Sequence, residues 1–276
     1  MNTNFRFAKK LSVLAIAAAA TTSAHAIGTF QEFEVSEGSV PGAFANTFIA
    51  DKGNGGYNEV LTVNIDGTFD TQAYADFTAY YKNDGSNLVS TTQIGGGAFG
   101  ATYQYQIYAV FNSSGVLTPT GFQGLTGSFS LYIDPNSNTT KTLGSTGLDA
   151  VILGNNSDDY LIASTSSVVY ANGLVGTPGA FDFLFKNLVL TSVDQDLLSP
   201  GVQAGTTYFT DPNPFHVQVQ TNGDFDAFPN VPGPGTYTNI SGDVSFVFPV
   251  PEPASLALMG LGLVGLGFSR RRGAAK

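Results

Sequence analysis

Residues 61–81 read LTVNIDGTFDTQAYADFTAYY, and the hydrophobic pattern of this stretch decides the fold class. Leu61, Val63 and Ile65 alternate with polar residues, as in a strand that buries one face. An Asp-Gly pair at 66–67 follows, and this dipeptide is typical of two-residue hairpin turns. The first part of the stretch therefore predicts a strand that runs into a tight turn.

The second part of the stretch has some apolar residues at helical spacing, but a period of two fits it better. One face of this predicted strand carries Phe69, Thr71, Ala73, Ala75, Phe77, Ala79 and Tyr81, and the other carries Asp70, Gln72, Tyr74, Asp76, Thr78 and Tyr80. We therefore expect a second strand that pairs with residues 61–65 to make a hairpin.

The same alternation recurs along the chain between short stretches rich in Gly, Pro and Asn. Further candidate strands are TYQYQIYAVF (102–111), SFSLYID (128–134), DYLIAS (159–164), AFDFLFKNLVL (180–190), FHVQVQ (215–220) and DVSFVF (243–248). About ten short strands at this spacing are typical of an antiparallel all-β domain. The sequence thus predicts a jelly-roll-like β-sandwich spanning residues 27–249, with no internal domain boundary.

Composition and charge restrict the partners of this domain. Residues 27–249 contain four lysines, no arginine and 20 acidic residues, a net charge of −16. Such a domain repels nucleic-acid phosphates and anionic membranes, so we expect no nucleic-acid partner. The chain has no cysteine, which excludes a disulfide framework and thiolate chemistry.

The N-terminal 26 residues have the features of a secretory signal peptide. A basic segment with Arg6 and Lys9 precedes a short apolar run, LSVLAIAAAA, at residues 11–20. Ala24 and Ala26 then give the small-x-small pattern of a cleavage site. We expect the mature chain to begin at Ile27.

The C-terminal segment, residues 250–276, combines three features in a fixed order. Pro251, Glu252 and Pro253 come first, and an uncharged run from Ala254 to Phe268 follows. A cluster of Arg270, Arg271 and Arg272 ends the segment. The run is short for a bilayer span of about 20 residues, and arginines after an apolar helix stay on the cytoplasmic side. The segment predicts a short transmembrane helix with the arginines as its stop-transfer signal.

This C-terminal order resembles the PEP-CTERM sorting signal. The resemblance covers residues 250–273, and it implies that residues 251–253 are the sorting motif. It further implies a protein exported by a Gram-negative bacterium and processed by an exosortase in the inner membrane. The membrane contact through the helix would then be transient, and the product would go to the cell surface or the extracellular matrix.

Parts of the central domain resemble flocculation-associated PEP-CTERM proteins. The residues that carry this resemblance are GGYNEVLTVNIDGTFDTQAYADF (55–77), YAVFNSSG (108–115) and GSFSLYIDP (127–135). The resemblance implies a matrix or surface protein that supports cell aggregation or biofilm formation with exopolysaccharide.

No stretch of the domain carries a catalytic signature, so we expect a protein that is not an enzyme and needs no cofactor. Asp134, Asn136 and Asn138 imitate the start of a calcium loop, but Thr139 stands where that loop needs glycine. Turn formation explains these residues more simply, so we predict no metal site. His216, the one histidine left after signal cleavage, lies on the polar side of its predicted strand.

Two other functions stay open on the sequence. Tyr74, Tyr80 and Tyr108 fall on outward faces and could stack on sugar rings, which would make the domain a carbohydrate-binding module. Pairs of acids could instead serve a secreted glycan-active enzyme. These pairs are Asp158 with Asp159, Asp194 with Asp196, and Asp224 with Asp226.

Overall fold

The structure is a computed structural model that describes residues 30–95, 105–174, 179–191, 205–225 and 233–249. These residues form strands almost throughout, as the alternating patterns predict. The hairpin at residues 61–81 is confirmed, with Leu61 opposite Thr71 and Val63 opposite Phe69. Gly67 takes the positive φ of 83° that its turn requires, a conformation open to glycine at no steric cost.

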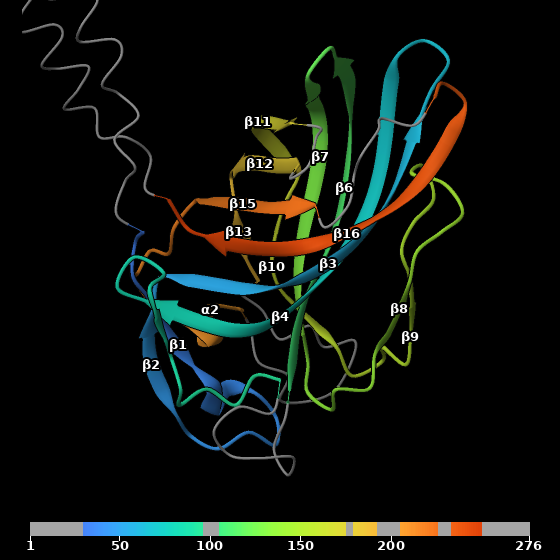
Figure 1. Cartoon of the computed structure of the whole chain (residues 1–276). Coiled ribbons are helices and arrows are strands. Elements are labelled where there is room, and N and C mark those ends of the chain that lie inside the picture. The colour runs from blue at the N-terminus through green and yellow to red at the C-terminus, as the bar shows by residue number, and fades with distance from the viewer. Residues whose placement is uncertain (1–29, 96–104, 175–178, 192–204, 226–232, 250–276) are drawn as a thin grey trace, which may run out of the picture.

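Eight antiparallel strands form a closed ring (Figure 1). In ring order they are β3 (Lys52–Val63), β4 (Thr68–Lys82), β6 (Gln106–Thr118), β7 (Gly121–Asp134), β11 (Ser167–Leu174), β12 (Gly179–Lys186), β15 (Gln218–Phe225) and β16 (Thr236–Val247). β16 pairs with β3, so the first and last strands of the ring are neighbours.

The predicted β-sandwich is therefore wrong, because the strands make one closed barrel instead of two stacked sheets. The long strand β7 causes the closure. Its second half pairs with β10 (Tyr160–Thr165), and its first half pairs with β11, with Gly121 opposite Leu174 and Gln123 opposite Asn172. Alternation along a strand shows that one face is buried, but a sandwich and a barrel both bury one face.

The interior of the barrel is packed with aromatic rings from facing strands. Phe111 of β6 contacts Phe183 of β12, with ring centroids 5.0 Å apart. Phe69 of β4 contacts Phe122 of β7 at 5.5 Å. Both pairs meet edge to face, which is a favoured geometry for aromatic rings.

A bulge at Thr78 changes which side of β4 faces inward. Up to Phe77, the face that the sequence predicts to be apolar is the buried one. Beyond Thr78, Tyr80 is 1% exposed and Tyr81 is partly exposed, the reverse of the prediction. An extra residue in one strand shifts the alternation by one, and an apolar-polar pattern does not reveal it.

A small three-stranded sheet lies at one end of the barrel (Figure 1). Its strands are β14 (Phe209–Asp211), β1 (Phe33–Ser36) and β2 (Thr47–Ala50), in that order. The 3-10 helix η1 (Glu37–Ser39) follows β1, and the short helix α2 (Gly205–Tyr208) leads into β14.

A buried hydrogen-bond network joins the small sheet to the barrel. The hydroxyl of Tyr208 lies 3.0 Å from that of Tyr80 and 2.8 Å from that of Tyr105. Tyr105 donates to the Glu37 carboxylate at 2.9 Å. Glu37 has no exposed surface, and Thr92 also donates to it. Since a buried carboxylate must be hydrogen-bonded, this network fixes the small sheet against the barrel.

The remaining strands lie outside the ring. They are β5 (Asn87–Leu88), which pairs with β4, β13 (Val189–Leu190), which pairs with β10, and the two-stranded sheet of β8 (Thr140–Thr142) and β9 (Ile152–Gly154). No helix within the described residues is long and apolar enough to cross a membrane. The transmembrane helix predicted for Ala254–Phe268 lies outside the described residues, as does the signal peptide.

Candidate functional site

The last strand of the barrel leads directly into the C-terminal segment. β16 ends at Val247, and Phe248, which follows it, has no exposed surface. The Phe248 ring contacts Phe33 of β1 at 5.0 Å and Phe215 at 4.9 Å between centroids. It also contacts Phe209 of β14 at 5.4 Å. Phe248 is therefore anchored in an aromatic cluster, and we call the point where the chain leaves this cluster the tail exit.

His216 lies beside the tail exit. Its ring stacks on the Phe248 ring at a centroid distance of 6.1 Å and an angle of 13°. Its Nε2 lies 3.3 Å from the backbone oxygen of Glu32. Burial lowers the pKa of His216, so its neutral form is favoured near neutral pH. The residue predicted to be on an outward polar face is half-buried against the end of the barrel.

A hollow of about 770 Å³ opens next to His216. Four acidic residues line it, and they come from separate parts of the chain: Glu32, Asp51, Asp84 and Asp211. Glu32, Asp84 and Asp211 are exposed. The acidic hollow therefore places negative charge at the tail exit.

Asp51 is the buried member of the acidic hollow. Its carboxylate accepts hydrogen bonds from the backbone N–H of Asp84 at 2.6 Å and of Gly85 at 3.0 Å. Burial raises the pKa of Asp51, and the charges of Asp84 and Glu32 raise it further, against the lowering effect of the two hydrogen bonds. The acids of the hollow thus repel one another.

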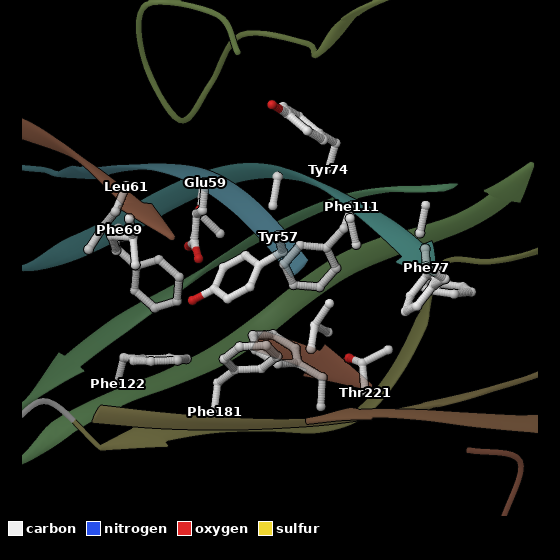
Figure 2. A pocket seen from close by; sticks show the side chains of 18 of the residues that line it. Tyr57, Glu59, Leu61, Phe69, Tyr74, Phe77, Phe111, Phe122, Phe181 and Thr221 are labelled. Carbon is white, nitrogen blue, oxygen red and sulfur yellow. The ribbon is translucent and has the colours of Figure 1, made fainter. Parts of the chain in front are cut away.

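The barrel interior holds a second, much smaller space (Figure 2). This cavity measures about 50 Å³, and aromatic rings make up most of its lining. Such a volume admits a few water molecules, whereas pockets for drug-sized ligands run to several hundred Å³. The cavity is too small for a sugar ring.

Glu59 is the acidic residue among the side chains that line this cavity. It points inward from β3 beside Tyr57 and Leu61 (Figure 2). Its carboxylate accepts a hydrogen bond from the Thr71 hydroxyl. Burial raises the pKa of Glu59 to about 7, and the hydrogen bond from Thr71 opposes this shift. The carboxyl group is therefore protonated in a large share of molecules near neutral pH.

The three outward tyrosines predicted from the sequence have different environments. Tyr80 is buried, and its hydroxyl is hydrogen-bonded to that of Tyr208. Tyr108 has no exposed surface. The Tyr108 hydroxyl donates to Asp159 at 2.5 Å, and Lys141 lies 4.7 Å from the centre of the Tyr108 ring. Of the three, Tyr74 alone keeps partial exposure, and it points away from the cavity (Figure 2).

Three aspartates, Asp134, Asp158 and Asp159, come together outside the barrel, with ligand atoms within 4.8 Å of one another. Among the residues that the structure describes, this is the cluster of carboxylates close enough together to hold a metal. Asp134 accepts hydrogen bonds from the backbone N–H of Asn136 and of Thr139, which confirms the predicted turn. Asp159 accepts from Thr139 and Tyr108. Protein donors therefore already bind these carboxylates.

Sequence reasoning missed the acidic hollow, because its four acids are scattered and none has a local signal. Glu59 had a signal, since it interrupts the apolar face that Tyr57 and Leu61 share. Other predicted residues lie outside the described residues: Ala24, Ala26, Asp194, Asp196, Asp226, Pro251, Glu252, Pro253, Arg270, Arg271 and Arg272. Asp224, the partner predicted for Asp226, is exposed at the end of β15.

The described residues thus define a compact acidic barrel whose last buried side chain lies immediately before an independent C-terminal signal. A family model described as the PEP-CTERM protein-sorting motif matches residues 249–272. A search of curated proteins and a search of solved structures gave no match.

The chain therefore carries a PEP-CTERM protein-sorting motif at residues 249–272, which supports its being a substrate of an exosortase. The motif implies export and processing during a transient stage at the membrane.

Proposed function

We propose that this protein is a non-enzymatic component of the cell surface or extracellular matrix that supports flocculation or biofilm formation together with exopolysaccharide. The observation that carries the proposal is the sorting motif at residues 249–272, which follows the acidic barrel without a spacer. In this view the barrel is the cargo, and residues 250–276 hold it at the membrane until the exosortase acts.

The charge and packing of the barrel support a matrix role. A net charge of −16 over residues 27–249 keeps copies of the domain apart and soluble, and it is compatible with neutral glycans as partners. The small interior cavity offers no room for a sugar substrate. The small cavity argues against a glycan-active site inside the barrel.

Deletion and complementation test the proposal. A strain that lacks the gene should flocculate less, and the wild-type gene should restore flocculation in a sedimentation assay. A variant with Pro251, Glu252 and Pro253 changed to alanine should stay unprocessed and fail to restore it. Unchanged flocculation after deletion would disprove the aggregation role, and full restoration by the motif variant would disprove the need for sorting.

A carbohydrate-binding module remains the second candidate, and the partly exposed outward ring of Tyr74 is the observation in its favour. Glycan-array binding that is lost in Tyr74→Ala and kept in Tyr237→Ala would support this function. Tyr237 is a suitable control because it is 64% exposed and lies on β16. Equal binding by both variants would exclude Tyr74 as the contact.

A further inference from the structure

The distance between the barrel and the sorting motif is short. Phe248 is fixed in the aromatic cluster, and Pro251 is the third residue after it. Because an extended chain spans at most about 3.6 Å per residue, the motif begins within about 11 Å of Phe248. A small protein domain is about 30 Å across. An enzyme that binds residues 251–253 must therefore touch the surface of the barrel around the tail exit.

The surface at the tail exit is acidic. The Phe248 ring stacks on His216, and His216 lines the acidic hollow. Glu32 and Asp211, both exposed, lie in the lining of the same hollow. A molecule that reaches the motif thus meets negative charge next to the exit.

No acid of the hollow forms an ion pair within the part of the chain that the structure describes. The ion pair found there joins Lys141 to Asp76 at 2.9 Å, and it involves no acid of the hollow. Mutual repulsion within the hollow favours a partner that brings positive charge. The chemistry of the surface therefore fits a basic, donor-rich partner.

We propose that the face of the barrel around the tail exit, formed by Glu32, Asp211, His216 and the hollow between them, is a contact surface for the exosortase. The proposal rests on the sorting that the motif implies, and it adds a role for the cargo domain in its own processing. The enzyme meets this face with basic residues, while it binds the motif a few residues away.

Charge reversal in the full-length chain tests this contact. Glu32→Lys with Asp211→Lys should slow processing about tenfold in pulse-labelled cells that carry the exosortase, because removing opposite charges from an interface slows association. The matched control is Asp224→Lys with Asp243→Lys, since both residues are exposed acids on neighbouring strands of the barrel wall. The control should be processed at the wild-type rate, and protease resistance of both barrels should confirm folding.

A spacer between the barrel and the sorting motif shows whether the charge reversal acts through contact with the enzyme or through an indirect effect on the barrel. Ten Gly/Ser residues inserted between Pro249 and Val250 add about 17 Å of average reach, so the enzyme no longer has to touch the exit surface. In the chain with the spacer, Glu32→Lys with Asp211→Lys should slow processing less than twofold. Processing of the reversed native-length chain at the wild-type rate would overturn the proposal, as would a tenfold effect that persists with the spacer.

The alanine variant of residues 251–253 distinguishes a failure of the sorting function from a failure of the proposed contact surface. If it is processed normally, the sorting function itself fails. If it is unprocessed while the charge-reversed chain is processed at the wild-type rate, sorting holds and only the contact surface is wrong.

Discussion

Phe248 and Phe33 pack edge to face with ring centroids 5.0 Å apart, so the last core side chain of the barrel rests on the first strand of the small sheet. Neither ring has more than 1% of its surface exposed. This contact joins the two ends of the folded domain. It also sets the place from which the sorting motif extends.

The first prediction concerns this contact. Phe248→Ala removes a fully buried ring, and we expect a loss of about 3–5 kcal/mol in the free energy of unfolding. Chemical denaturation of the purified protein measures it. Tyr237→Ala is the control, since Tyr237 is 64% exposed and a surface change costs within about 0.5 kcal/mol. Equal losses in both variants would show that Phe248 is not anchored.

The second prediction concerns the pH dependence that Glu59 creates. The folded protein holds the Glu59 proton up to a pKa of about 7, whereas the unfolded chain releases it near the ordinary glutamate pKa of 4.5. Between these two values the unfolded state binds fewer protons, so stability falls as pH rises from 4.5 to 7. The fall attributable to Glu59 should be about 3 kcal/mol, since one pKa unit corresponds to about 1.4 kcal/mol.

Glu59→Gln isolates this effect. The variant keeps the shape of the side chain but cannot ionise. The difference in unfolding free energy between wild type and variant should therefore change across pH 4.5–7 and be constant above and below it. Denaturation series at several pH values measure this difference, and a constant difference throughout would contradict the assignment.

Much of the local structure could be predicted from alternation alone, because a strand that buries one face must place apolar side chains at every second position. Residues 61–63 and 68–77 follow this rule, so their strands and inward face were predicted correctly. Ile65, predicted to lie on the buried face, is instead 87% exposed in the turn between the two strands. The rule failed at Thr78, where a bulge inserts one residue and turns Tyr80 inward. It also gave no information on how the sheet closes, because closure depends on the pairing of β11 with β7.

The functional features also differ in whether the sequence alone reveals them. The sorting motif was found because its residues are contiguous and ordered, and a motif of this kind needs no tertiary structure to be seen. The acidic hollow was not found, because Glu32, Asp51, Asp84 and Asp211 meet only after folding. Tyr108 was misjudged for a related reason, since Lys141 and Asp159, which cover it, lie more than 30 residues away in the sequence.

The third prediction concerns the buried partner of Tyr108. Burial and the nearby Asp159 raise the pKa of Tyr108, so its hydroxyl stays protonated and donates. Tyr108→Phe removes this donor from the buried carboxylate of Asp159, which should cost about 1–3 kcal/mol of stability. Tyr74→Phe, on the outer face of β4, should change stability little in the same denaturation assay. Unchanged stability in Tyr108→Phe would mean that the hydrogen bond from Thr139 alone is enough for the Asp159 carboxylate.

The last prediction tests the closure of the barrel. Gly121 sits where β7 meets β11, and a Cβ added there would lie 1.8 Å from the backbone oxygen of Gly173. Backbone cannot move aside as a flexible side chain can, so Gly121→Ala must separate the two strands. Gly56→Ala is the control, because its added Cβ would lie 3.7 Å from the nearest atom.

We expect Gly121→Ala to lower stability and to expose the amides of Asn172 and Leu174 to hydrogen exchange, since these residues pair with β7. The control should keep those amides protected. Because Asn172 and Leu174 also pair with β12, stability has to be read together with exchange. Wild-type stability and protection in Gly121→Ala would contradict the close pairing of β11 with β7.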